Sequence, residues 1–529
     1  MDAPTPLPDG LVRDLGHPAA HPADPSAPDG VARIQTHLSH VFLTGDRAVK
    51  IRKPVDLGFV DFSRLSDRNR DCLAEVSLNR RLAPDVYLGV APIVRGESGW
   101  ELGKLGEALR PGHEHAVVMR RLRPGTDALS LLGAGRLGPR RLEAAAAALA
   151  RFHADHAVPA QAEAHAWRPE VDAPMQACIE ALRGGPVARP EEATALASGW
   201  TRALDLRRSV FERRAQRRVD GHGDVRLEHL WFETADGPPL FIDCVEFDPE
   251  LRRIDPASEV AFLAMDLAHR GRSDLGEHFL GCYAVESDDF DLYGVVDPFV
   301  AYRAAVRAKV AAIAAEDRAL APEQRASAHA AARSYLKLAL RSLEVPGPGR
   351  VIALCGTVGT GKSTVARALA RAIGGAVVVS TDRTRKRVVA AGRSEERYAP
   401  ERIEAVYEAV LARAAPALAS GRTVLLDATF QLRETRDRVR AWARAAGADA
   451  WLLHVDCPEA IARDRLRVRS ERGGDASEAG PERLATSRAA FERPDEWPGD
   501  RRIELDTGDE ADIEDEIRAA AERIGIRTR

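Results

Sequence analysis

Residues 351–364 have the side-chain spacing of a loop that binds the phosphates of a nucleotide. An apolar run from Val351 to Cys355 leads into the glycine-rich segment, which consists of Gly356, Thr357, Val358, Gly359, Thr360, Gly361, Lys362, Ser363 and Thr364. Glycines let the backbone turn its N–H groups around a phosphate, and a following helix adds the positive end of its dipole. We expect Lys362 to reach the β- and γ-phosphates and Ser363 to complete the shell of a magnesium ion.

Two further pairs in this half of the chain can complete a phosphoryl-transfer site. Asp382 and Arg385 lie in the stretch Ser380–Lys386, which begins where a second apolar run ends. Strand ends at one edge of a parallel sheet face the ligand, so Asp382 can accept a proton from a substrate hydroxyl and Arg385 can hold a substrate anion or the transferring phosphoryl group. Arg465 and Arg469 lie four residues apart on one face of a predicted helix, where they can close over a phosphate. A helix N-cap with a basic turn and a solvated helix face are the alternatives.

The first half of the chain contains its own set of groups for phosphoryl transfer. Such a reaction needs one carboxylate near the attacking hydroxyl and another that holds magnesium. Asp224, in the stretch His222–His229, fits the first role, and Asp243, at the end of an apolar run, fits the second. Upstream, Lys50 lies in a strand-like stretch and can pair with phosphate, while Glu75 in the following helix can orient it. Taken singly, an aspartate in a loop is more often a turn or cap residue.

The elements that must position the C-terminal groups alternate regularly between strands and helices. This alternation predicts a parallel sheet with helices on both faces. We expect its strands at residues 351–355, 376–380, 423–427, 450–455 and 502–505. A Pro- and Gly-rich linker at 345–350 precedes this domain, which we place at 351–529.

The N-terminal groups require a different arrangement. A hairpin around residues 44–47, a helix at 64–82 and strands at 87–94 and 116–119 precede a mostly helical region that ends at residue 343. A small β-rich lobe before a larger helical lobe resembles the order of a protein-kinase-like fold. We place this kinase-like domain at 31–344 and expect residues 1–30, rich in Pro, Ala and Asp, to form a flexible tail.

Bulk composition narrows the class of protein. The 529 residues are 45% hydrophobic and 29% charged, with a net charge of −4, so the chain suits roughly two to four domains and lacks the basic excess of a general nucleic-acid binder. No apolar run approaches the ~20 residues of a membrane span, and no apolar signal core opens the chain. The six cysteines show neither a CxxC pair nor metal-ligand spacing. We therefore expect a cytoplasmic protein that does not associate with membranes.

Residues 31–343 resemble the aminoglycoside phosphotransferase family, whose signature is His-Gly-Asp, a metal-binding Asn and then Ile-Asp. The resemblance implies that Asp224 is the catalytic base and that Asp243 is the magnesium ligand. It also implies that Lys50 and Glu75 form the clamp on the phosphates.

The same resemblance assigns His222 a structural role in its loop and marks two departures. His229 stands where the family has Asn, and a neutral imidazole is a poor ligand for magnesium. The hairpin at Ser39–Asp46 also lacks a glycine-rich phosphate cover. These departures leave open a domain with altered magnesium binding or without activity.

Residues 351–529 are similar to small P-loop kinases, including gluconate kinases, polynucleotide 5′-kinases and zeta-toxin-like enzymes. The stretch Val424–Thr429 resembles their third strand, which implies that Asp427 holds magnesium through water or positions the substrate loop. In these kinases an arginine-bearing lid occupies the place of Arg465 and Arg469. The whole chain resembles bacterial fusions of an aminoglycoside-phosphotransferase-like domain with a P-loop ATP-binding domain of the AAA type.

We therefore predict a phosphotransferase that depends on ATP and Mg²⁺ and has two nucleotide sites. Each site would move a γ-phosphoryl group to a hydroxyl of a small molecule by positioning and charge neutralisation. One alternative is a regulatory ATPase whose N-terminal domain binds a ligand without chemistry, which His229 favours. The other is a kinase that acts on 5′ ends of nucleic acids, against which the slightly acidic balance of the chain argues.

Overall fold

The chain forms two compact units, each built from segments that are distant in sequence. In this computed structural model the structure describes residues 4–22, 24, 30–56, 58, 60–106, 108–159, 167–388, 400–472, 480–509 and 513–525. The first unit comprises Met1–Ala144, Phe152–Ala160 and Arg217–Glu259. The second comprises Ala145–Arg151, Gln161–Gln216 and Val260–Arg529. The helical region predicted as part of the first domain thus belongs mostly to the second unit.

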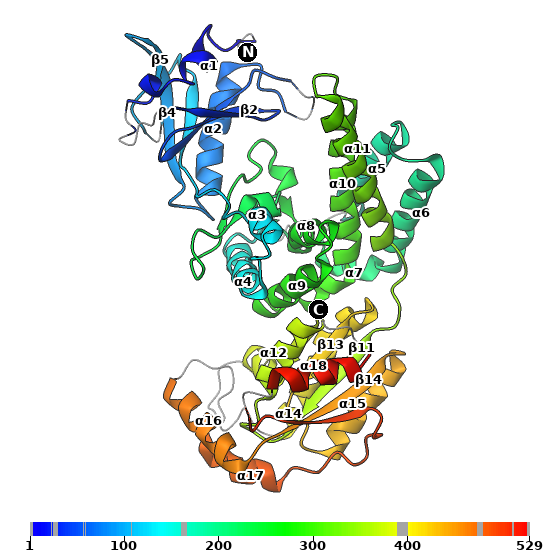
Figure 1. The fold of residues 1–529 in the computed structure, drawn as a ribbon. Coiled ribbons are helices and arrows are strands. Elements are labelled where there is room, and N and C mark those ends of the chain that lie inside the picture. Colours follow the sequence, from blue (N-terminus) through cyan, green and yellow to red (C-terminus); the bar gives the residue numbers. More distant parts are fainter. Residues whose placement is uncertain are drawn as a thin grey trace. The chain divides into compact units, whose positions relative to one another are not determined.

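An antiparallel sheet of six strands, in the order β1-β2-β3-β6-β4-β5, dominates the first unit (Figure 1). Its strands are β1 (Ala32–Gln35), β2 (Ser39–Leu43), β3 (Arg47–Arg52), β4 (Tyr87–Gly96), β5 (Gly99–Leu102) and β6 (His115–Arg120). The predicted hairpin is present, with Val41 opposite Lys50 in the β2–β3 pair. Because side chains alternate along a strand, Val49 and Ile51 enter one core, and Lys50 points to the opposite face, on which helix α2 (Leu65–Asn79) packs.

The opening segment differs from the predicted flexible tail. It contains helix α1 (Leu11–Asp14) and the short 3₁₀ helix η1 (Pro18–Ala20). Leu11 and Leu15 are completely buried in the same core as Val49. Burial of two leucines stabilises the packing of this segment on the sheet by roughly 3–6 kcal/mol. Its polar composition therefore concealed an apolar pair that belongs to the core.

The remainder of the first unit is made of short elements that carry the predicted catalytic loop. They are α3 (Ala128–Gly133), part of α4 (Pro139–Asp155), β7 (Val219–Asp220), η2 (Leu227–His229), β8 (Leu230–Trp231), β9 (Leu240–Phe241), η3 (Pro249–Leu251) and β10 (Arg253–Ile254). The strands pair as two small antiparallel ribbons, β8 with β9 and β7 with β10. Helix α8 (Pro256–His269) begins directly after the second ribbon.

The second unit begins with a helical region. Its helices are α5 (Trp167–Arg183), α6 (Pro190–Leu206), α7 (Arg208–Arg214), most of α8, α9 (Ser273–Ser287), η4 (Phe290–Gly294), α10 (Val296–Glu316) and α11 (Pro322–Ser342). The long helices α10 and α11 pack along each other (Figure 1). Residues 345–349 contain no helix or strand.

A parallel sheet of five strands, in the order β12-β13-β11-β14-β15, completes the second unit. Its strands are β11 (Arg350–Cys355), β12 (Val377–Ser380), β13 (Thr423–Asp427), β14 (Asp449–Asp456) and β15 (Arg502–Asp506). The helices around it are α12 (Lys362–Ala372), α13 (Thr381–Val388), α14 (Pro400–Ala419), α15 (Arg433–Ala445), α16 (Glu459–Arg472), η6 (Pro481–Arg483), α17 (Leu484–Ala489) and α18 (Ile513–Arg523). Helices α12 and α18 share one core with the sheet, and α14 and α15 also contact it. The predicted fold class, with an antiparallel N-terminal lobe and a parallel C-terminal sheet, is confirmed. Among the residues described, no helix has the length and apolar character needed to cross a membrane.

Candidate active sites

The phosphate-binding loop connects β11 to α12 and is shaped by its glycines. Gly356 and Gly359 have φ values of 144° and 83°, which side chains rarely allow. A Cβ on Gly356 would lie 2.1 Å from the carbonyl oxygen of Val455, and one on Gly359 would lie 2.8 Å from that of Ala462. The loop therefore lies directly against β14 and α16. Gly361 caps α12 without a side-chain hydrogen bond, which leaves the first N–H groups of the helix to bind an anion.

Lys362 lies inside this loop. Its side chain is buried, and Nζ donates a hydrogen bond to the carbonyl oxygen of Thr357 at 2.6 Å. Burial lowers the pKa of Lys362 because the charged ammonium loses its hydration. An ammonium group in this environment gains strongly from a nearby anion, so the side chain suits the phosphate-binding role predicted for it.

Asp427 and Ser363 provide oxygen ligands beside this lysine. Asp427 ends β13 and is only 6% exposed. Burial raises the pKa of its carboxyl group, although a hydrogen bond from Ser363 and the charge of Lys362 oppose the shift. A hydroxyl and a carboxylate are the hard oxygen donors that Mg²⁺ prefers. This donor set fits a magnesium ion, which Ser363 and Asp427 would hold.

Asp382 and Arg385 lie next to the same strand end. Ser380 pairs with Asp427 across the β12–β13 ladder, so α13 begins beside Asp427. Thr381 Oγ1 also donates a hydrogen bond to the carbonyl oxygen of Asp427 at 3.3 Å. Asp382 and Arg385 form an ion pair of 2.7 Å within α13. The structure thus brings Asp382, the predicted proton acceptor, and Arg385, the predicted anion-binding residue, to the strand end that carries Asp427.

Arg465 is linked to the phosphate-binding loop through a residue that sequence reasoning missed. Its guanidinium donates to Oγ1 of Thr507 at 3.0 Å and to the carbonyl oxygen of Thr507 at 2.6 Å. Thr507 Oγ1 in turn donates to the carbonyl oxygen of Thr360 at 2.7 Å. Arg469 lies close enough to Lys362 to contribute to the lowering of its pKa. Thr507 directly follows β15. Its place at the end of a strand in the parallel sheet was the sequence signal that could have marked it as a site residue.

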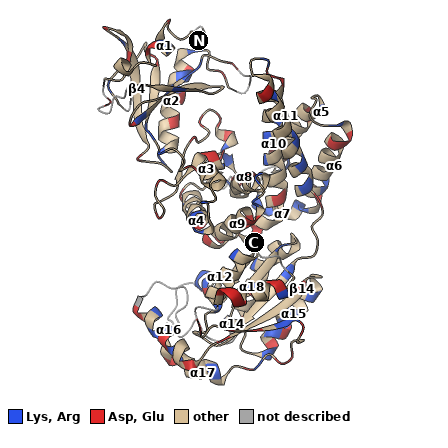
Figure 2. Ribbon diagram, viewed as in Figure 1, with Lys and Arg blue, Asp and Glu red and all other residues tan. Residues whose placement is uncertain are grey.

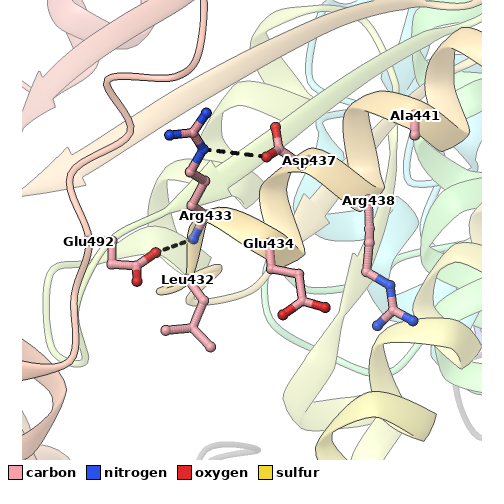
Figure 3. Close-up of a pocket in the computed structure, with 7 residues that line it drawn as sticks. All are labelled: Leu432, Arg433, Glu434, Asp437, Arg438, Ala441 and Glu492. Atoms are coloured by element: carbon pink, nitrogen blue, oxygen red, sulfur yellow. Dashed lines mark hydrogen bonds and ion pairs between the residues drawn. The ribbon is translucent and has the colours of Figure 1, made fainter.

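Two pockets lie beside α15. The larger, of about 620 Å³, is lined by Leu432, Arg433, Glu434, Asp437, Arg438, Ala441 and Glu492 (Figure 3). None of the predicted site residues lines it. The second, of about 310 Å³, includes Tyr407 and Phe430, whose rings stack at 5.3 Å. Tyr407 is close enough to Arg385 and Asp382 for their charges to influence its pKa. Through Tyr407 this pocket is close to Asp382 and Arg385, although neither residue lines it.

In the first unit, Lys50, Glu75 and Asp243 are in contact. Lys50 Nζ lies 2.9 Å from Glu75 Oε1 and 2.9 Å from Asp243 Oδ1. Burial alone would lower the pKa of Lys50, but the two carboxylates outweigh it and raise the pKa. Burial likewise opposes ionisation of Asp243, and Lys50 holds its pKa well below the usual range. Lys50 and Glu75, the two residues of the predicted clamp, are therefore in contact. The charge of Lys50 is neutralised by Glu75 and Asp243.

The loop that carries Asp224 is held by buried hydrogen bonds. His222 Nε2 donates to the carbonyl oxygen of Ile242 at 2.9 Å. Glu259, in α8, accepts hydrogen bonds from the backbone N–H groups of His222 and Gly223 at 2.6 and 3.3 Å. Burial lowers the pKa of His222 to about 4, so the ring is neutral near neutral pH. These contacts support the predicted role of His222 as a support for the loop.

Arg226, which sequence reasoning missed, lies between the predicted base and the imidazole of His229. Its Nε donates to Asp224 Oδ1 at 2.9 Å, and its Nη1 donates to Glu228 Oε2 at 2.8 Å. His229 Nδ1 donates to the carbonyl oxygen of Asp224 at 2.8 Å, so Nε2 carries the lone pair and accepts from Arg226 Nη2 at 3.1 Å. The signal was an arginine two residues after Asp224. Lys50 and Arg226 neutralise both candidate carboxylates, and an imidazole replaces the amide ligand. These residues do not fit a magnesium ion, and we derive no step through one here.

A second buried arginine organises the carboxylates behind Lys50. Arg52 is only 3% exposed and forms ion pairs with Asp71, Glu75 and Glu246. Burial raises the pKa of Glu246 to about 8, although Arg52 opposes the shift. The three carboxylates are close enough to hold a cation, and the Arg52 guanidinium supplies it. Their separation in sequence gave no signal for this cluster.

Comparisons with known proteins were consistent with the geometry of the C-terminal site. Residues 351–494 match the family described as an AAA domain, so this half is a P-loop nucleotide-binding domain, as predicted. The chain is 33% identical over 490 residues to the uncharacterized proteins Rv2004c of Mycobacterium tuberculosis and Mb2027c of Mycobacterium bovis, covering 89% of this chain and 91% of each relative.

Solved structures with some similarity include two kinases. One is a choline/ethanolamine kinase family protein from Mesorhizobium loti, with 13% identity and a TM-score of 0.38 over 63% of this chain and 99% of that chain. The other is the APS kinase CysC of Mycobacterium tuberculosis, with 20% identity and a TM-score of 0.28 over 34% of this chain and 99% of that chain.

Proposed function

We propose that the C-terminal half of this chain is an ATP- and magnesium-dependent kinase for a small molecule with a hydroxyl group. The chain belongs to the same family as the mycobacterial proteins named above. The observation that carries this proposal is the convergence of Lys362, Ser363, Asp427 and Asp382 at one edge of the parallel sheet. Lys362 and Asp427 are buried, and burial disfavours the charge of each. Such perturbed groups in one site are typical of a place where a ligand supplies the missing charges.

In the proposed reaction the protein contributes binding, orientation and proton transfer. The N–H groups of the loop and Lys362 bind the triphosphate, and the start of α12 adds its dipole. Ser363 and Asp427 would hold magnesium, which when bound would supply positive charge to the phosphates. Asp382 accepts the proton of the acceptor hydroxyl as its oxygen bonds to the γ-phosphorus, while the bond from that phosphorus to the β–γ bridging oxygen breaks and ADP leaves. Arg385 orients Asp382 through their 2.7 Å ion pair.

Transfer of labelled phosphate from ATP to a panel of small hydroxyl compounds tests the proposal. We expect Lys362→Ala to abolish transfer by the C-terminal half, because the loop loses its only ammonium group. Lys337→Ala, an exposed lysine in α11, is the matched control and should behave as wild type. Equal transfer by wild type and Lys362→Ala would contradict the proposal.

A second candidate function concerns the N-terminal half. The sequence predicted two nucleotide sites in the chain, one of them in this half. Lys50 and Arg226 already neutralise its carboxylates, which favours a ligand-binding domain without magnesium-dependent chemistry. We propose this regulatory role in preference to a second kinase. Asp224→Asn should then leave every ATP-dependent transfer unchanged, and loss of one transferred product in that variant would restore the prediction of two active sites.

The charge pattern argues against nucleic acid as the acceptor. Figure 2 shows Lys and Arg interspersed with Asp and Glu along the helices α15 and α16. Many of these arginines are paired locally, as Arg467 is with Asp464 and Glu471. A strand-binding groove needs a run of basic groups that track the phosphates. The small-molecule acceptor is therefore the better proposal.

A further inference from the structure

Helix α9 runs along the open edge of the C-terminal parallel sheet. Strand β12 is the edge strand on this side, and α9 packs against it within the second compact unit. Gly375, just before β12, approaches α9 so closely that a Cβ would lie 2.4 Å from the Cβ of Glu277. At the far end of β12, Arg383 in α13 pairs with Glu286 in α9 at 2.9 Å. One helix of the preceding region thus follows the strand from its start to the helix that carries Asp382.

A partly buried ionic contact fixes this arrangement at the start of β13. Arg422 donates to both oxygens of Glu277, in α9, at 2.7 and 2.8 Å. It also donates to both oxygens of Asp297, in α10, at 2.7 and 3.0 Å. The guanidinium lies over the ring of Tyr293, in η4, at 5.0 Å from its centroid. A bidentate contact to two carboxylates is geometrically specific, which distinguishes it from a chance surface pair.

A third contact lies on α14, the helix that precedes β13. Arg413 donates to both oxygens of Asp288, each at 3.0 Å, and η4 packs on the same helix. Helix α9 is itself buried on most of its circumference, from Leu275 to Ala284. A helix buried in this way serves as internal structure between two layers and not as a surface element. We call the contacts of Arg383, Arg413 and Arg422 the α9 seam.

We propose that the α9 seam is a working part of the C-terminal kinase and that Arg422 is its positioning residue. The seam holds β12 and β13, whose ends carry Asp382 and Asp427, in register with the phosphate-binding loop. Arg422 touches none of the reacting groups and acts through these strands. The inference rests on the proposed function of the C-terminal site, and it adds that the preceding helical region is required for that function.

The test compares the full-length wild type with Arg422→Ala in three measurements. Hydrogen–deuterium exchange of residues 377–388 should become at least about tenfold faster, because the edge strand loses its support. The kcat for phosphoryl transfer should fall by about 10- to 100-fold, as expected when the general base Asp382 is misplaced. The affinity for ATP should change less than about threefold, because the loop lies between β11 and α12. Arg518→Ala, which removes an exposed pair in α18, is the matched control.

Two further variants guard against a general folding defect. Arg422→Lys keeps one ion pair and should recover part of the lost kcat. Glu286→Gln breaks only the exposed contact to Arg383 and should lower kcat slightly with normal circular dichroism. Faster exchange with unchanged kcat, or unchanged exchange in Arg422→Ala, would overturn the proposal. Absence of phosphoryl transfer in the wild type would instead contradict the proposed function. The exchange measurement on Arg422→Ala does not depend on activity, so it still tests the α9 seam in that case.

Discussion

The two candidate sites of this chain differ in how the charges of their side chains are neutralised. In the N-terminal site, Lys50 lies between Glu75 and Asp243, and Arg226 lies on Asp224. In the C-terminal site Asp382 is likewise paired, with Arg385, but Lys362 donates to a neutral carbonyl, and a hydroxyl donates to the buried Asp427. The pKa shifts therefore run in opposite directions. Lys50 has a raised pKa and Asp243 a lowered one, whereas Lys362 has a lowered pKa and Asp427 a raised one.

This difference shows that the presence of the same residue types does not define a reactive site. Charges that neutralise each other have little to gain from a ligand. Charges that burial disfavours gain most when an anion and a cation arrive. Four predictions, from the largest expected effect to the smallest, test whether the comparison holds.

The largest effect is expected on stability, in the N-terminal site. Arg52→Met should lower the free energy of unfolding by about 3–5 kcal/mol, because it leaves buried carboxylates without their cation. Urea denaturation measures the change. Arg33→Met, at an exposed position of β1, should stay within about 0.5 kcal/mol of wild type. An Arg52→Met protein as stable as wild type would remove the structural role assigned to this cluster.

The next effect concerns chemistry in the C-terminal site. Asp427→Asn should reduce phosphoryl transfer by about 10²- to 10³-fold, because a ligand for the charge-neutralising cation is lost. Its stability should not fall, since burial of a neutral amide costs less than burial of a carboxylate. Asp464→Asn, on the exposed face of α16, serves as the control. Equal losses of activity in Asp427→Asn and Asp243→Asn would erase the distinction between the sites.

The third effect is a pH dependence of stability from His222. Its pKa is about 4 in the folded chain, because of burial, and 6.5 without that environment. Well above pH 6.5 the ring is neutral in both the folded and the unfolded chain, so it does not affect the free energy of unfolding. As the pH falls below 6.5, the unfolded chain binds the proton first, so the folded state loses about 2 kcal/mol by pH 5. Denaturation of wild type and His222→Gln at pH 7.5 and pH 5 gives the difference, and identical pH profiles would contradict the assignment.

The smallest effect is expected in metal binding. Wild type should bind one equivalent of Mn²⁺ tightly in the presence of ATP, since of the two candidate sites the C-terminal one offers the donors that fit a hard cation. Asp243→Asn should change this stoichiometry by less than about 0.2 equivalents, whereas Asp427→Asn should remove it. Electron paramagnetic resonance counts the bound ion. Binding of two equivalents by wild type would show that a metal ion can displace Lys50 and Arg226 from the N-terminal carboxylates.

Local sequence patterns predicted the C-terminal half well because its signals are contiguous. The apolar runs that end at Cys355 and Asp427 match β11 and β13, and the glycine spacing matches the loop. What local patterns could not predict is the partner of each charge. Arg226 and Arg52 determine the character of the N-terminal site, yet Arg52 meets Glu246 only through folding. The packing of Leu11 likewise depends on a sheet that forms later in the sequence.

The covering of β12 by α9 has a consequence for biosynthesis. A bare edge strand offers its backbone to other chains, and nascent proteins that expose one tend to aggregate. Because translation proceeds from the N-terminus, the ribosome releases α9 before it makes β12. Helix α9 is therefore available to cover β12 as soon as that strand is synthesised. If the C-terminal half were encoded before the N-terminal half, the edge of the new sheet would stay exposed until α9 was made.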